Sequence, residues 1–143
     1  MSYLAWVGAV AVLVCGLSAA AAEKSTAAVA DAKGRYFEVR TYIANEGKFE
    51  AMHARFRDHT GRLFKKHGID VIGYWVPTDP AKSKNTLVYM LAYPSKEARD
   101  AAWKAFRADP EWIAAKAKSE EGGPLVAKAT EEFFTATDYS PVK

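Results

Sequence analysis

Strand and helix patterns alternate in a fixed order from residue 35 onward, and this order restricts the fold more than any other feature of the chain. Runs rich in β-branched and aromatic residues predict strands, and apolar residues spaced three or four apart predict helices. The predicted strands cover residues 35–43, 69–76, 86–93 and 131–138, and the predicted helices cover 45–67, 96–108 and 110–120. This β-α-β-β-α-β order predicts an α+β domain with a ferredoxin-like, split β-α-β fold and a four-stranded antiparallel sheet.

Residues that start and stop helices support these boundaries. Asn45 is expected to cap the first helix, which Gly68 ends. Ser95 is expected to cap the second, and Asp109 followed by a proline restarts the helical pattern. Trp103 lies about 130° from the alanine stripe of its helix, so we expect it to face a partner chain or the following segment. Residues 125–130 show no clear pattern and stay unassigned.

The predicted sheet has more apolar surface than one layer of helices can cover. Strands 69–76 and 86–93 carry apolar side chains on both faces. Both helices of a split β-α-β fold lie on one face of the sheet, which leaves the other face bare. Packing two copies sheet against sheet would bury it. We therefore expect a homodimer.

The first 22 residues differ from the rest of the chain. Eighteen are hydrophobic and none is charged, although the chain contains 20 Lys+Arg and 17 Asp+Glu. A membrane span needs about 20 apolar residues, whereas the apolar run here covers residues 4–17 and is followed by small residues. This pattern predicts a signal peptide over residues 1–22, cleaved after Ala22, with Ala21 and Ala30 as alternative cleavage sites. A flexible leader over 23–34 and the domain over 35–140 follow. We expect a periplasmic or secreted protein; the alternative is an uncleaved N-terminal membrane anchor.

Charge and cysteine content narrow the function classes. The net charge of +3 is not gathered into a basic stripe, so no nucleic-acid partner is expected, and no membrane partner once the signal is removed. Cys15 lies inside the predicted signal, so the mature domain has neither a thiol nucleophile nor a cysteine-ligated zinc site. The histidines His53, His59 and His67 are not at the i, i+4 spacing of a helical metal site. No metal or cofactor is expected.

The first strand carries charge on one face. Glu38 and Arg40 alternate with Tyr36 and Tyr42 and point the same way. In a sheet buried on both sides these charges must be paired or hydrogen-bonded. One interpretation is the polar end of a pocket, where Arg40 holds an anionic ligand group. The other is a cross-strand ion pair that fixes the register of the sheet.

Three further residues are candidates for a pocket. His53 is expected near a cleft between helix and sheet, as a haem ligand or general base, or else as an ordinary helix-edge histidine. Tyr74 and Trp75 belong to a larger aromatic set that is suited either to the walls of a pocket for a planar apolar molecule or to core and dimer packing. The other members of this set are Tyr89, Tyr93, Trp103 and Trp112. The candidate ligand-binding residues are therefore Arg40, Glu38, Tyr42, His53, Tyr74 and Trp75. No catalytic residue is assigned.

An ordered set of short segments resembles the NIPSNAP family. The segments are Tyr36–Tyr42, Gly47-Lys48-Phe49, Lys66-His67-Gly68, Gly73-Tyr74-Trp75, Leu87–Tyr93 and Arg99–Trp112. The resemblance runs from Tyr36 to Asp138 and implies a dimeric α/β barrel. It implies no single activity, because related barrels include cofactor-free monooxygenases, haem-degrading enzymes, stress-induced proteins and binding modules.

Two function classes remain open. The favoured one is a non-catalytic dimeric binding or interaction module, because no catalytic constellation emerges from the sequence. The alternative is a small enzyme of the monooxygenase-like barrel type acting on a hydrophobic or aromatic ligand, with haem as one candidate. A wide cavity lined by His53, Arg40 and aromatic residues would favour a ligand-binding or enzymatic barrel, whereas a cleft filled by side chains would favour an interaction module.

Overall fold

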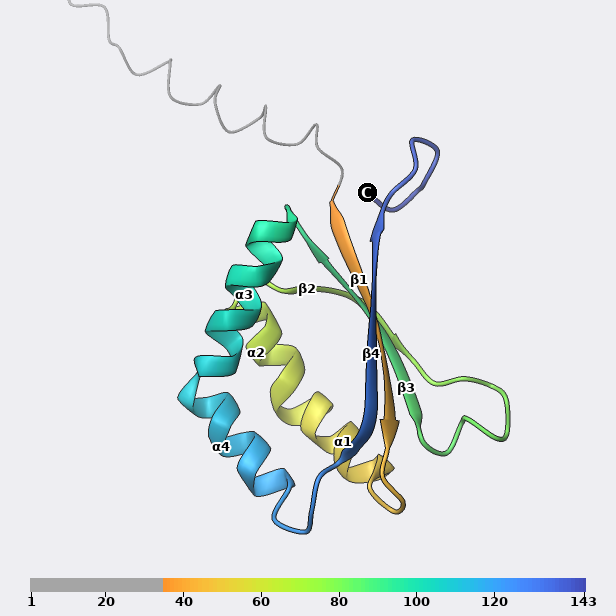
Figure 1. The fold of residues 1–143 in the computed structure, drawn as a ribbon, viewed down its shortest axis with the longest axis vertical. Coiled ribbons are helices and arrows are strands. Elements are labelled where there is room, and N and C mark those ends of the chain that lie inside the picture. Colours follow the sequence, from red (N-terminus) through yellow and green to blue (C-terminus); the bar gives the residue numbers. More distant parts are fainter. Residues whose placement is uncertain (1–34) are drawn as a thin grey trace, which may run out of the picture. The chain divides into compact units, whose positions relative to one another are not determined.

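The computed structural model describes residues 35–143, where a four-stranded antiparallel sheet has all its helices on one side (Figure 1). The elements are β1 (Tyr36–Ala44), α1 (Phe49–Arg55), the π-helical turn η2 (Phe56–Thr60), α2 (Gly61–Lys66), β2 (Asp70–Trp75), β3 (Thr86–Tyr93), α3 (Lys96–Ala108), α4 (Pro110–Ser119) and β4 (Val126–Thr135). The strand order β2-β3-β1-β4 confirms the predicted ferredoxin-like fold. The predicted signal peptide and leader, residues 1–22 and 23–34, lie outside the described residues.

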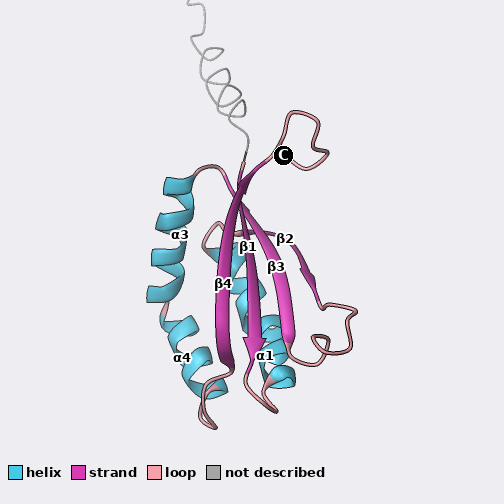
Figure 2. Cartoon of the chain, turned by 45° about the vertical axis from the view of Figure 1, so that its right-hand side comes forward, coloured by secondary structure: helices cyan, strands magenta, loops and turns pink. Residues whose placement is uncertain are grey.

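The central strands divide the sheet into two different faces. β1 pairs with β3 so that Glu38 lies opposite Leu91 and Arg40 opposite Tyr89. These side chains face the helices, since Glu38 accepts a hydrogen bond from Trp103 of α3. The opposite face carries half-buried apolar side chains from both strands, including Val39, Val88 and Met90. None of the helices within residues 35–143 covers that face (Figure 2).

The first helical segment starts later than expected and is not a uniform α-helix. Asn45 does not cap it, because a turn with Gly47 at φ 68° intervenes and the helix begins at Phe49. Instead, the Asn45 side chain donates a hydrogen bond to the carbonyl of Pro124 (2.8 Å). Residues 56–60 form the π-helical turn, where the Thr60 hydroxyl donates to the carbonyl of Arg55 (3.2 Å). Gly68, at φ 72°, ends the segment as predicted.

The second pair of helices starts at the predicted residues. Ser95 accepts a hydrogen bond from the backbone N–H of Ala98, and Asp109 accepts one from Glu111 at the start of α4. The expectation for Trp103 was wrong: this residue is buried against the sheet, because its indole N–H reaches the carboxylate of Glu38. No helix within residues 35–143 is long and apolar enough to cross a membrane.

The edge strands depart most from the sequence prediction. β4 begins at Val126 rather than at residue 131, so the unassigned segment is its first half. Almost every residue of β4 is exposed, which explains why the alternation of apolar and polar residues is weak there. β2 contains a bulge between Val71 and Gly73. Gly73 lets the Trp75 ring pack against the backbone here, since a Cβ atom would lie 2.7 Å from that ring and the ring would have to shift.

Candidate ligand-binding site

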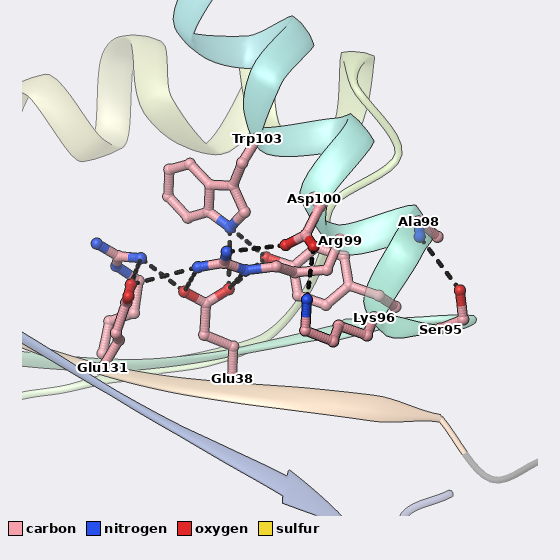
Figure 3. Close-up of polar contacts among 10 residues, drawn as sticks. Glu38, Ser95, Lys96, Ala98, Arg99, Asp100, Trp103 and Glu131 are labelled. Atoms are coloured by element: carbon pink, nitrogen blue, oxygen red, sulfur yellow. Dashed lines mark hydrogen bonds and ion pairs between the residues drawn. The ribbon is translucent and has the colours of Figure 1, made fainter.

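The carboxylate of Glu38 is the centre of a polar network between the sheet and α3. It accepts hydrogen bonds from Arg40 Nη1 (2.6 Å), Arg99 Nη2 (2.8 Å), Trp103 Nε1 (2.9 Å) and the Tyr93 hydroxyl (3.0 Å). Figure 3 shows Arg99 and Trp103 reaching Glu38 from the same helix. Burial raises the pKa of Glu38, but the hydrogen bonds outweigh it and lower the pKa from 4.5 to about 2. The carboxylate therefore stays ionised at neutral pH.

Arg40 lies between two carboxylates and two aromatic rings. Its Nη1 lies 2.6 Å from a carboxylate oxygen of Glu38 and 2.6 Å from one of Glu131, which belongs to the neighbouring strand β4. Its guanidinium carbon lies 4.6 Å from the centre of a Trp103 ring and 5.5 Å from that of Tyr42. Tyr89 and Tyr42, with Glu38, raise the pKa of Arg40 although burial opposes them. These contacts agree with the interpretation of the charged face as a cross-strand ion pair.

A cavity of about 310 Å³, here called the inner cavity, lies between the sheet and the helices next to this network. Its walls are mainly aromatic: Tyr42, Phe56, Phe64, Tyr89, Trp103 and Trp112. The exposed residues Lys116 and Ala129 also line it, which places its opening between α4 and β4. A concave, mostly apolar cavity with a few polar groups is the usual form of a small-molecule site.

The charged residues of the inner cavity lie on its helical wall. Arg55 is buried and donates from Nη1 to Glu120 (2.7 Å) and to the hydroxyl of Ser119 (3.3 Å). Lys116 also contacts Glu120, at 3.0 Å. The wall thus has two cations and one carboxylate, and its net charge is positive.

Three buried polar side-chain atoms within residues 35–143 have no hydrogen-bond partner: Nε of Arg40, Nε of Arg55 and the hydroxyl of Tyr89. Arg55 and Tyr89 line the inner cavity, and Arg40 packs on two of its lining rings. Buried polar groups are nearly always paired, so three such atoms around one cavity are unusual. Burial, followed by the nearby Tyr42, raises the pKa of Tyr89 well above its ordinary value, so its hydroxyl remains a donor.

A second concavity, here called the outer cleft, lies beside β2 and has a volume of about 510 Å³. His53, Tyr74 and Trp75 line it together with Arg57. Phe56, on the π-helical turn, lines both the outer cleft and the inner cavity. The structure therefore divides the predicted candidates into two groups.

Tyr42 lines the inner cavity beside the network of Glu38 and Arg40, whereas His53, Tyr74 and Trp75 belong to the outer cleft. Neither the inner cavity nor the outer cleft is lined by both His53 and Arg40, the arrangement that was expected to favour a ligand-binding or enzymatic barrel. Within the described part of the chain, no group of three or more His, Cys, Asp or Glu side chains is placed to hold a metal ion.

Sequence reasoning did not identify Arg55 as a residue of the inner cavity, and it named Tyr89 only as one of several aromatic residues suited either to pocket walls or to packing. Arg55 lies at a helical position where an arginine is ordinarily exposed, and nothing in the sequence shows that Glu120 and Trp112 cover it. Tyr89 occurs in a strand that is apolar on both faces. Only the pairing register, which places it opposite Arg40, shows which face it occupies.

Comparison with known proteins identifies the family. The NIPSNAP family model matches residues 37–141. A NIPSNAP family protein of unknown function from Agrobacterium tumefaciens superposes with a TM-score of 0.67 at 21% identity, covering 78% of this chain and 96% of that chain. An uncharacterised NIPSNAP-like domain protein from Burkholderia xenovorans gives 0.66 at 19% identity, covering 76% and 90%.

A more distant structure has the same fold and a stated activity. SnoaB, a cofactor-independent oxygenase from Streptomyces nogalater, superposes with a TM-score of 0.50 at 15% identity, covering 76% of this chain and 98% of that chain. At this identity the likeness concerns the fold alone. No curated protein matches the chain.

Proposed function

We propose, from the premise that the chain belongs to the NIPSNAP family, that its domain binds a small, mainly apolar molecule in the inner cavity without chemically changing it. The observation that carries this proposal is the aromatic cavity with the unpaired hydroxyl of Tyr89 in its wall. An interaction module with no ligand would have no need of a cavity here, and closer packing of these side chains would stabilise it.

The charges near the cavity favour binding over catalysis. A general base that works near neutral pH needs a pKa close to that pH. The pKa of Glu38, at about 2, lies far below neutral pH, and its oxygens already accept hydrogen bonds from four residues. Burial raises the pKa of Tyr89 well above its ordinary value, so its hydroxyl does not ionise at neutral pH and is no general base there either.

An oxygenase of the cofactor-independent type is the alternative, since SnoaB has this fold and that activity. It would use the aromatic inner cavity as a dry reaction chamber. Haem is less suited to the inner cavity, because His53, the histidine expected to ligate it, lines the outer cleft instead.

We also propose that the protein acts outside the cytoplasm as a homodimer. The uncharged apolar run over residues 4–17 supports export. The half-buried apolar face of the sheet, with no helix of residues 35–143 over it, supports pairing of two copies.

Native mass spectrometry of the protein purified from the periplasm of its own host tests the binding proposal. We expect a protein that starts near Glu23 and carries a small organic molecule. Ala129 lines the cavity opening, so Ala129→Phe should abolish the bound mass. Ala105→Phe, at an exposed position of α3, should leave it unchanged. A ligand retained equally by both variants would contradict binding in the inner cavity, and an oxygenated product in the bound fraction would favour the enzymatic alternative.

A further inference from the structure

The unpaired polar atoms around the inner cavity are all hydrogen-bond donors. The Nε–H groups of Arg40 and Arg55 can only donate. The hydroxyl of Tyr89 can both donate and accept. Among residues 35–143, none of the buried side-chain atoms left without a partner is an acceptor alone. An acceptor oxygen in the cavity is therefore the kind of ligand group that can pair with both Arg55 and Tyr89.

The net positive charge of the cavity wall also favours a ligand with an acceptor oxygen. Arg55 and Lys116 share a single carboxylate, Glu120. A negatively charged ligand group in the cavity would balance the second positive charge of this wall. A neutral apolar ligand would instead leave the donors of Arg55 and Tyr89 buried without partners, which costs free energy.

The volume limits the size of the ligand body. An apolar cavity of about 150 Å³ is enough for benzene, and the inner cavity has about twice that volume. Its walls contain the aromatic rings of Tyr42, Phe56 and Trp103, which suit a flat body of about two rings.

We infer that the inner cavity binds an aromatic acid: a flat body of one or two rings carrying an anionic oxygen group, a carboxylate or a phenolate, that accepts hydrogen bonds from Arg55 and Tyr89. This inference rests on the proposed function and specifies the chemical class of its ligand. The ring system of the ligand packs between the aromatic side chains, and its anionic group neutralises the net positive charge of the helical wall.

Isothermal titration calorimetry of the full chain with a matched pair of probes tests the inference. The probes are 2-naphthoate and its neutral counterpart 2-naphthamide, which share the ring system and differ in the anionic oxygen. We expect naphthoate to bind at least about tenfold more tightly, because it accepts charge-assisted hydrogen bonds. Ala129→Phe should abolish binding of both probes.

Two variants test whether Tyr89 is responsible for the preference for naphthoate. Tyr89→Phe should weaken naphthoate binding about tenfold and reduce the preference over naphthamide. This change should have little effect on the stability of the free protein, because the hydroxyl that it removes makes no hydrogen bond of good geometry and has only Tyr42 as a neighbouring hydroxyl. Tyr36→Phe, a half-buried tyrosine of β1 outside the cavity lining, should change the naphthoate affinity less than twofold.

The possible failures are distinguishable. Equal affinities for the two probes, or naphthoate binding unaffected by Tyr89→Phe, would overturn the inference while leaving the proposed apolar binding site in place. Naphthoate binding that survives Ala129→Phe would place the anion outside the inner cavity and would also overturn it. No binding of either probe at millimolar concentration would count against both the inference and the proposed function.

Discussion

Glu38 is the residue with the largest number of charged and polar partners in the domain core, and its role can be separated from that of Arg40. Removing Arg40 leaves the Glu38 carboxylate bonded to Arg99, Trp103 and Tyr93. No unpaired charge is created, so Arg40→Met should lower the free energy of unfolding by only about 1–2 kcal/mol. Glu38→Gln removes the buried negative charge that the half-buried Arg40 and Arg99 share, and should cost about 3–5 kcal/mol.

Urea denaturation of both variants at pH 7 measures this difference. A larger loss of stability for Arg40→Met than for Glu38→Gln would contradict this prediction. It would mean that the ion pair of Arg40 with Glu131 stabilises the network more than Glu38 does. The pH dependence gives a second readout. Because the pKa of Glu38 is depressed to about 2 from 4.5, its contribution to stability is complete above pH 4.5 and is lost as the pH falls toward 2. Glu38→Gln should lack that part of the acid destabilisation.

The π-helical turn between α1 and α2 is the secondary-structure feature most closely tied to the site. Such turns are rare and often occur at functional sites, and here Phe56 of the turn separates the inner cavity from the outer cleft. The buried Thr60 hydroxyl donates to the carbonyl of Arg55 across the widened turn. This bond holds together the part of the helix that carries both Arg55 and Phe56.

Thr60→Val keeps the shape of the side chain and removes the donor. We expect a loss of about 1 kcal/mol in the free energy of unfolding, measured by urea denaturation, and weaker naphthoate binding because Arg55 and Phe56 are less firmly placed. Thr137→Val, at an exposed position after β4, is the matched control and should stay within about 0.5 kcal/mol. A Thr60 variant as stable as that control would show that the backbone alone maintains the turn.

The elements that sequence reasoning predicted well are those whose burial gives a clear pattern. β3 was predicted with its observed ends because it is central and apolar on both faces, and the starts of α3 and α4 because Ser95 and Asp109 act as caps through local bonds. The first half of β4 and the π-helical turn were missed, since an exposed edge strand and a shift in backbone hydrogen bonding leave little trace in apolar spacing.

The site shows the same division between local and distant information. The shared face of Glu38 and Arg40 follows from the period of a strand, and it was predicted. Their partners Arg99 and Trp103 come from a helix about sixty residues away. Trp103 was assigned to the wrong side because the alanine stripe suggested another buried face. Neither contact can be found without the packing of α3 on the sheet.

Residues 35–143 form one layer of helices on one face of the sheet and leave the other face without a helix over it (Figure 2). This asymmetry leads to the last prediction, and the uncovered face is called the bare face. Val88 and Met90 of β3 lie half-buried on the bare face, beside the exposed ring of Trp75. If two copies pack these faces together, a charge introduced there would be buried without a partner. Val88→Glu should therefore separate the copies, whereas Ala105→Glu on the exposed side of α3 should not.

Sedimentation of a chain that begins at Glu23 measures the outcome. We expect about twice the chain mass at micromolar concentration for the unaltered protein and for Ala105→Glu, and the mass of a single chain for Val88→Glu. Circular dichroism should show that Val88→Glu keeps its helices and strands, because Val88 faces away from the core between sheet and helices. A stable monomer before any substitution would contradict the dimer. It would also show that this face is tolerated in water, since the last strand, β4, extends the sheet at its edge and does not cover the face.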